Sequence, residues 1–173
     1  FGVYLGTEDD KVLLPAKYAD PDIEEGDSMT VFVYRDSKDR LIATTLEPLI
    51  TLGEVKPLKV KQLTKIGAFM DWGLEKDLLL PFSEQTSRVE EGRTYPVALY
   101  IDKSDRLCAT TKIYPYLKTT DAYHTGDSVK GTAYEYIEKF GMFVAIDNMY
   151  QGLIPKKALY GRIRIGDEVK ATV

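Results

Sequence analysis

The sequence predicts an all-β protein built from small barrels set in a row, and two observations support this fold class. Landmarks recur in a fixed order, first at a shift of 66 residues and then at a shift of 74. Within a repeat, apolar and polar residues alternate with the period of two that is typical of half-buried strands, as in Val97, Leu99 and Ile101.

The repeat is clearest in its hairpin segment. YRDSKDRLIATT at 34–45 and YIDKSDRLCATT at 100–111 match at most positions. A second element also recurs. It consists of a glycine, a variable residue, an aromatic residue and an aliphatic residue, and its three copies are Gly2–Leu5, Gly67–Met70 and Gly141–Val144. Three copies of the landmarks in one order indicate three related units.

The second copy shows the expected strands most completely. A short helix or turn is expected near 82–88, and strands are expected at 57–65, 67–72, 77–81, 94–101 and 105–111. Asp102-Lys103-Ser104-Asp105 joins the last two strands with residues that favour tight turns. Five short strands in about 65 residues favour a small closed Greek-key barrel.

These residues resemble the S1 RNA-binding domain, an oligonucleotide/oligosaccharide-binding (OB) barrel. The tandem arrangement, with Leu-Pro or Ile-Pro after the third strand, resembles more specifically the bacterial conserved virulence factor B family. We therefore expect five-stranded S1-like barrels with short helical turns at 1–49, 50–116 and 117–173, the last of these beginning with a linker. The first lacks its first strand and the third its last, so we expect these residues to be part of a longer protein.

The resemblance implies a single-stranded RNA-binding face with two stacking aromatics per barrel and a polar pair from the last hairpin. Stacking suits this role because every base has a π-face. The matching aromatics are Phe140 and Phe143 in the third copy, Ile66 and Phe69 in the second, and Phe1 and Tyr4 in the first. The hairpin pairs are Asp36 with Arg40 and Asp102 with Arg106.

Each of these assignments has a structural alternative. Phe69 and Phe143 either pack inside the barrel or face outward, and alternation favours the outward direction if Ala68 and Met70 face inward. The hairpin pairs are either RNA contacts or incidental surface pairs. Trp72 is either an exposed stacking platform or a cap over the barrel mouth.

Two tyrosines and three prolines also bear on whether the chain has the RNA-binding face of S1 domains. Tyr134 and Tyr136 share one strand face by spacing, and packing at the domain junction is the preferred interpretation. Many RNA-binding S1 domains carry a histidine after the third strand, where this chain has Pro15, Pro81 and Pro155. Proline has no N–H to donate, so this departure weakens the transfer of the RNA site to every copy.

Charge separates the copies within a net charge of −4. Residues 1–49 hold 11 acidic and 5 basic residues, whereas 50–126 and 127–173 each have a net charge of +1. The first barrel should therefore repel phosphate and act as a spacer or protein-contact module. In the second copy, lysines at 56, 59, 61 and 65 line one strand. The third barrel is the expected RNA-binding unit, with cations at Lys156, Lys157, Arg162 and Arg164.

Residues suited to catalysis or metal binding are few. The only histidine, His124, lies in the stretch 118–126, and Cys108 aligns with Ile42, an apolar strand position. No phosphate loop or nucleophile motif occurs, and no apolar run approaches the roughly 20 residues that cross a bilayer. We expect no enzyme activity, metal, cofactor, small-molecule substrate or membrane partner, and a cytoplasmic location.

The leading functional prediction is sequence-tolerant binding of single-stranded RNA in post-transcriptional regulation. The rival is a protein-interaction scaffold that has kept the S1 fold and lost its RNA face. Duplex-DNA binding ranks third because the charge disfavours it.

Overall fold

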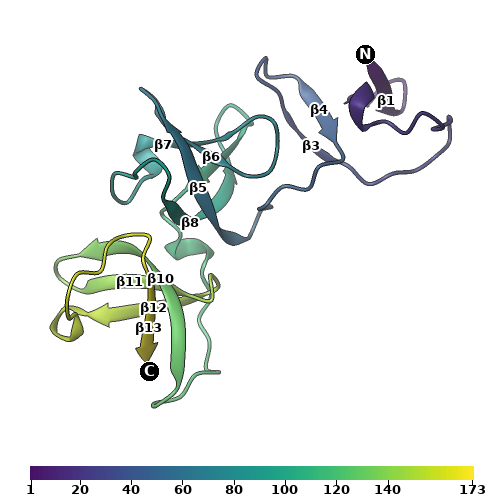
Figure 1. Ribbon diagram of the computed structural model, residues 1–173. Coiled ribbons are helices and arrows are strands. Elements are labelled where there is room, and N and C mark those ends of the chain that lie inside the picture. The colour runs from purple at the N-terminus through teal and green to yellow at the C-terminus, as the bar shows by residue number, and fades with distance from the viewer.

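The computed structural model describes residues 1–173 and contains three β-sheets that follow one another along the chain. Figure 1 shows them as a row in which the middle sheet lies between the other two, with the termini at opposite ends. We call the units barrel 1 (β1–β4), barrel 2 (β5–β9) and barrel 3 (β10–β13). No helix is long and apolar enough to span a bilayer.

Barrel 2 has all five strands, in the spatial order β7-β6-β5-β8-β9. The two edge strands, β7 and β9, lie next to each other, and the Thr111 N–H donates to the Glu84 carbonyl, which nearly closes the barrel. Its elements are β5 (Val55–Leu63), β6 (Gly67–Asp71), β7 (Leu78–Pro81), the 3₁₀ turn η2 (Phe82–Glu84), β8 (Thr94–Ile101) and β9 (Leu107–Thr110). The five-stranded barrel expected from the sequence is confirmed.

Barrel 1 has four strands in the order β1-β2-β4-β3. Strands β2 and β4 pair in parallel at Leu13 and Ile42, so the sheet curls as in barrel 2, but no strand lies between β1 and β3. Its elements are β1 (Gly2–Gly6), β2 (Lys11–Pro15), η1 (Ala16–Tyr18), β3 (Phe32–Arg35) and β4 (Leu41–Thr44). The expectation that this terminal barrel is incomplete is confirmed.

Barrel 3 repeats the first four strands of barrel 2, in the order β12-β11-β10-β13. Its elements are β10 (Ser128–Ile137), β11 (Gly141–Ile146), β12 (Tyr150–Pro155), η4 (Lys156–Ala158) and β13 (Glu168–Thr172). A β-bulge in β10 between Ala133 and Glu135 changes the side-chain alternation there. The prediction that Tyr134 and Tyr136 share a face is therefore wrong: Tyr134 is buried at the junction with barrel 2, whereas Tyr136 is 42% exposed.

The three prolines have a common structural role. Pro15, Pro81 and Pro155 end β2, β7 and β12, and each precedes a 3₁₀ turn with nearly the same backbone angles. Each is paired across the ladder with a glycine, such as Gly67 opposite Pro81, where an added Cβ would lie 2.3 Å from the Leu80 carbonyl oxygen. Gly67 also has φ +145°, so the tight approach requires glycine at this position.

The hydrophobic core is centred on barrel 2. Its largest cluster has 15 buried residues, and Tyr34 of barrel 1 belongs to it, with Phe32 and Ile42 packed against it. A second cluster of six joins barrels 2 and 3, and a cluster of three lies inside barrel 3. Barrel 1 therefore depends on barrel 2 for much of its apolar burial.

The segment after β9 is packed for part of its length. Ile113 and Leu117, which flank η3 (Tyr114–Tyr116), are buried in the cluster that joins barrels 2 and 3. Lys118 continues as a parallel bridge to Tyr150 on the edge of β12. Packing and backbone hydrogen bonds therefore fix residues 114–118 to both barrels.

Candidate nucleic-acid interface

The outer face of barrel 3 carries two neighbouring phenylalanine side chains. Phe143 lies on β11 between the buried Met142 and Val144, so its ring points away from the barrel interior. Phe140, at the turn before β11, is 48% exposed, and its ring centroid lies 6.3 Å from that of Phe143 in an edge-on arrangement. Lys139 places its Nζ 5.7 Å from the Phe140 ring. Exposed rings with a nearby cation provide the surface on which unpaired bases stack.

Phe143 is only partly exposed because one edge of its ring faces the junction. Its ring centroid lies 6.0 Å from Tyr114 of η3 and 6.3 Å from Tyr134 of β10. It also packs against the junction cluster that contains Ile113 and Leu117. Packing and outward orientation therefore both apply to Phe143, and Phe140 supplies most of the free aromatic surface.

The equivalent face of barrel 2 centres on Phe69. Ala68 and Met70, its neighbours on β6, are fully buried, which confirms that Phe69 faces outward, although its side chain is only partly exposed. Across the ladder it lies between Gln62 of β5 and Leu79 of β7. The lysines of and after β5, at 56, 59, 61 and 65, are exposed, and two of them form ion pairs, Lys56 with Glu54 and Lys61 with Asp77.

The cations of barrel 3 divide into paired and unpaired side chains. Lys156 forms an ion pair with Glu138, which raises the pKa of the lysine, and Arg164 forms one with Glu90 of barrel 2. Lys157 and Arg162 are exposed and form no salt bridge. Of the four cations predicted from the sequence, Lys157 and Arg162 are therefore the two that can bind phosphate without first losing a carboxylate partner.

The hairpin pairs are used within the protein. The Asp36 carboxylate accepts hydrogen bonds from the Arg40 guanidinium at 2.8 and 3.0 Å and from two backbone N–H groups. Asp102 accepts the matching backbone bonds, and Arg106 lies 3.6 Å from it. Partial burial alone would raise the pKa of each aspartate, but these hydrogen bonds outweigh it and the pKa of each is lowered.

The two hairpins also bind each other. Arg35 of barrel 1 donates to the Asp105 carboxylate of barrel 2 at 2.9 Å, and Arg106 of barrel 2 lies 3.8 Å from Asp39 of barrel 1. Asp39 and Asp105 occupy the same position in the two repeats, both with φ near +60°. The geometry therefore favours a structural role for the predicted hairpin pairs. Their side chains stabilise the two hairpin turns, and Arg106 also contacts barrel 1.

Trp72 is buried, which corrects its place among the predicted RNA-stacking residues. It is 2% exposed, and its indole N–H donates to the Lys76 carbonyl at 2.6 Å. Its ring packs edge-on against Phe32 at 5.7 Å and Tyr34 at 6.3 Å, both from barrel 1. Trp72 therefore closes the mouth of barrel 2 beneath barrel 1 and offers no surface to a base.

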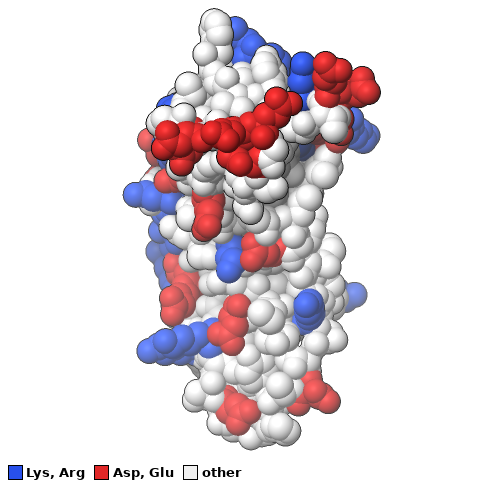
Figure 2. Space-filling model, turned by 90° about the vertical axis from the view of Figure 1, so that its right-hand side faces the viewer, with Lys and Arg blue, Asp and Glu red and all other residues white.

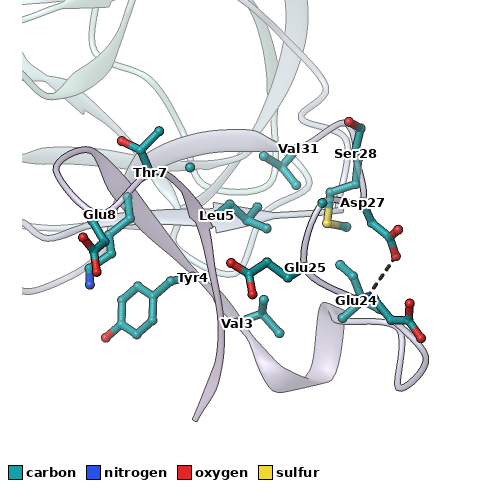
Figure 3. A pocket seen from close by; sticks show the side chains of 15 residues that line it. Val3, Tyr4, Leu5, Thr7, Glu8, Glu24, Glu25, Asp27, Ser28 and Val31 are labelled. Atoms are coloured by element: carbon teal, nitrogen blue, oxygen red, sulfur yellow. Dashed lines mark hydrogen bonds between the residues drawn. The ribbon is translucent and has the colours of Figure 1, made fainter.

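Barrel 1 presents an acidic surface. Figure 2 shows Asp and Glu side chains gathered over the end of the molecule that barrel 1 forms. Tyr4 is 62% exposed with Lys11 5.1 Å from its ring, but it lines a pocket of about 610 Å³ with Glu8, Glu24 and Glu25 (Figure 3). The pocket lies beside β1, where barrel 2 has its strand β5, and its carboxylates oppose phosphate binding.

Cys108 is held in an unreactive environment. It is buried on β9, and its Sγ donates to the Asp102 carboxylate at 3.6 Å. Burial and the nearby carboxylate raise the pKa of the thiol to about 11. The sequence-based interpretation of Cys108 as a core position agrees with this placement.

Three exposed residues were missed by the sequence reasoning. Phe82 is 38% exposed in η2, and the Arg88 guanidinium lies 4.4 Å from its ring centroid. Tyr160 is 84% exposed in the loop after η4. None belongs to the repeated aromatic element, and their only sequence signal is an aromatic residue with an arginine two or six positions further on.

The fold and these faces agree with a comparison to known proteins. The sequence profile of the S1 domain matches residues 1–46 and 52–112, more than half of the chain. The chain belongs to the S1 domain family. The resemblance seen in the sequence is thereby confirmed at the level of the S1 domain, and the family supports nucleic-acid binding as the general class of function.

Two relatives extend this S1 assignment. The Bacillus subtilis (strain 168) protein YitL, described as uncharacterized, is 37% identical over 81 residues, which are 46% of this chain and 27% of YitL. A multidomain protein with nucleic acid binding domains from Streptococcus pneumoniae TIGR4 superposes with a TM-score of 0.64 at 22% identity, over 98% of this chain and 62% of that one. The superposition supports the tandem S1 fold, and this chain spans only part of either relative.

Proposed function

We propose that this S1 protein binds single-stranded RNA with little sequence preference and acts in post-transcriptional regulation in the cytoplasm. The observation that carries the proposal is the aromatic pair Phe140 and Phe143 on the outer face of barrel 3, with Phe140 free to stack. The unpaired Lys157 follows Lys156, whose backbone N–H donates to the Phe140 carbonyl. Phe69 of barrel 2 is the secondary stacking residue. Assignment to the conserved virulence factor B branch of S1 proteins, and the units 1–49, 50–116 and 117–173, are part of the proposal.

The charge distribution supports a division of labour among the barrels. Barrel 1 carries a net charge of −6 and its free aromatic, Tyr4, lies among carboxylates. Barrels 2 and 3 carry a slight positive charge and the outward phenylalanines. RNA is therefore expected on barrels 2 and 3, with barrel 1 as a spacer or protein contact.

The test is fluorescence anisotropy of a labelled 15-nucleotide oligouridine and a mixed-sequence RNA at two salt concentrations. Phe140→Ala is the preferred variant because Phe143 also packs at the junction. Loss of one stacked ring should weaken binding by about 1–3 kcal/mol, or about 5- to 150-fold, and raising the salt should weaken it further. Phe140→Trp should retain affinity, and Tyr4→Ala should be neutral.

A protein-interaction scaffold is the second candidate, favoured by one observation. An apolar groove of about 460 Å³ runs between barrels 1 and 2, and it includes the exposed side chains of Val33, Leu41, Leu52 and Ile101. The absence of RNA binding at low salt would contradict the leading proposal and favour this one. Binding that Phe140→Ala leaves unchanged would reject the barrel 3 face.

A further inference from the structure

A cleft of about 720 Å³ separates barrels 2 and 3 on the side of their 3₁₀ turns. One wall is the segment between η2 and β8, and the other is the loop between η4 and β13. The lining residues that carry charge are Arg88, Glu90, Arg93, Arg162 and Arg164. Four arginines outnumber Glu90 and Asp167, the carboxylates that pair with them, so the cleft has a net positive charge in a protein whose net charge is −4.

Two of the four arginines hold the walls together. Arg93 of barrel 2 donates to Asp167 of barrel 3 at 2.9 Å and lies 3.2 Å from Glu90. Arg164 of barrel 3 forms an ion pair with the same Glu90. The cleft is therefore a fixed feature of the packed pair of barrels rather than a gap between independent units.

The other two arginines have no carboxylate partner. Arg88, in barrel 2, stacks on Phe82 at 4.4 Å, and Arg162, in barrel 3, is exposed without a salt bridge. A guanidinium stacked on a ring keeps its N–H edge available, and that edge fits the two oxygens of a phosphate. One unpaired arginine therefore stands on each wall.

Aromatic side chains accompany these arginines. Phe82 lies beneath Arg88, Tyr136 lines the cleft at 42% exposure, and Tyr160, 84% exposed, lies between two lining residues. Arginine with exposed rings is the combination that grips a single strand, because phosphates bind the cations and bases stack on the rings.

The cleft adjoins the aromatic face of barrel 3 through the β10–β11 hairpin. The Tyr136 hydroxyl donates to Glu138 at 2.7 Å, and Glu138 pairs with Lys156. The Lys156 backbone N–H donates in turn to the Phe140 carbonyl at 3.1 Å. A short chain of contacts therefore links the cleft wall to Phe140.

We infer that this inter-barrel cleft is a second RNA site that binds the sugar–phosphate backbone between Arg88 and Arg162, so that one strand crosses barrels 2 and 3. The inference rests on the proposed function, since it extends the strand bound at Phe140. Because ion pairs and the junction core already fix the two barrels, contacts on both add without the entropy cost of ordering a flexible linker.

The experiment compares two charge-matched double variants in the anisotropy assay over a salt series. Arg88→Gln/Arg162→Gln removes the unpaired cations of the cleft, and Lys38→Gln/Lys103→Gln removes two exposed hairpin lysines that form no salt bridge. The cleft variant should lose at least about 10-fold in affinity, and its log–log salt slope should fall by about 1.4 for two phosphates on a single strand. The hairpin variant should match the wild type.

A second readout locates the strand. Ultraviolet crosslinking of the oligouridine followed by mass spectrometry should mark Tyr160 or Phe82 in the wild type, and the cleft variant should lose the mark. All four arginine and lysine substitutions are at exposed positions, and a circular dichroism melt checks that each variant is folded.

The outcomes separate the inference from the proposed function. RNA binding that the cleft variant retains in full would overturn the inference and leave Phe140 as the site. Loss in the cleft variant with no loss in Phe140→Ala would support the cleft and reject the barrel 3 face. A wild type that binds labelled poly-glutamate and no RNA would overturn both and assign the arginines to an acidic protein partner.

Discussion

The junction between barrels 1 and 2 and the junction between barrels 2 and 3 use the same repeat in different ways. At the first, Trp72 and the hairpins make the contact, and the Phe69 face of barrel 2 stays outside it. At the second, the contact includes Phe143 itself, packed with Tyr114 and Tyr134. Equivalent phenylalanines therefore have different surroundings.

This difference shows how packing and binding compete for one aromatic face. An exposed ring binds bases, but an exposed ring next to another barrel also gains about 25 cal/mol for each Å² that it buries. Phe143 is partly buried at the junction, and Phe140, one position before β11, keeps more of its ring exposed for the stacking that we propose. In our proposal, the arginine cleft at the same junction adds RNA-binding surface where packing has covered part of the aromatic face.

The largest predicted effect breaks the first junction. Trp72→Ala should lower the free energy of unfolding by about 3–5 kcal/mol, because it leaves a cavity under Phe32 and Tyr34. Urea unfolding followed by circular dichroism measures the change, and hydrogen exchange should show β3 and β4 losing protection before β10 and β11 do.

Trp72→Phe is the control for this experiment, since it keeps an apolar ring in the same space. Its cost should be well below that of the alanine variant. A loss under about 1 kcal/mol for Trp72→Ala would show that barrel 1 does not depend on this contact.

A smaller effect tests the second junction. The Tyr134 hydroxyl is buried without a hydrogen-bond partner, whereas the Tyr95 hydroxyl, also buried, accepts the Glu90 N–H at 2.9 Å. Tyr134→Phe should leave stability unchanged or raise it by up to about 1 kcal/mol, and Tyr95→Phe should lower it by about 1 kcal/mol. Denaturant midpoints measure both, and a clear loss in Tyr134→Phe would indicate a partner for the hydroxyl.

An effect of similar size concerns the hairpins of the first junction and depends on pH. The folded-state pKa values of Asp36 and Asp102 lie below their ordinary 3.8, so each carboxylate stabilises the fold above that pH and loses this contribution as the pH falls through and below it. Asp36→Asn/Asp102→Asn should be less stable than wild type by about 1 kcal/mol at pH 7, a gap that narrows at pH 3.

Paired urea titrations at the two pH values measure this gap. Asp9→Asn, at an exposed position without a salt bridge or side-chain hydrogen bond, is the matched control and should show no gap at either pH. A gap of equal size at pH 3 and pH 7 would mean that the hairpin carboxylates do not titrate as the geometry indicates.

The sequence predicted the fold well because its signals are local and repeated. Alternation within one strand placed Ala68 and Met70 inside and Phe69 outside, and the shift of 66 residues identified the second barrel from the first. The same argument from alternation was wrong for Tyr134 and Tyr136. A β-bulge in β10 places the two side chains on different faces, and the bulge arises from the pairing of β10 with β11.

The tertiary structure decided which predicted site residues are free. Trp72 is buried by contacts with Phe32 and Tyr34, more than 30 positions away, and the pairing of Arg164 with Glu90 crosses 74 positions. The cleft between barrels 2 and 3 has no repeat signal because it arises only where two loops of different copies meet. By itself, the sequence determined the S1 fold, the outward phenylalanines and the acidity of barrel 1. Which aromatics and cations remain exposed depended on how the barrels pack, because that packing joins residues distant in the chain and buries or pairs their side chains.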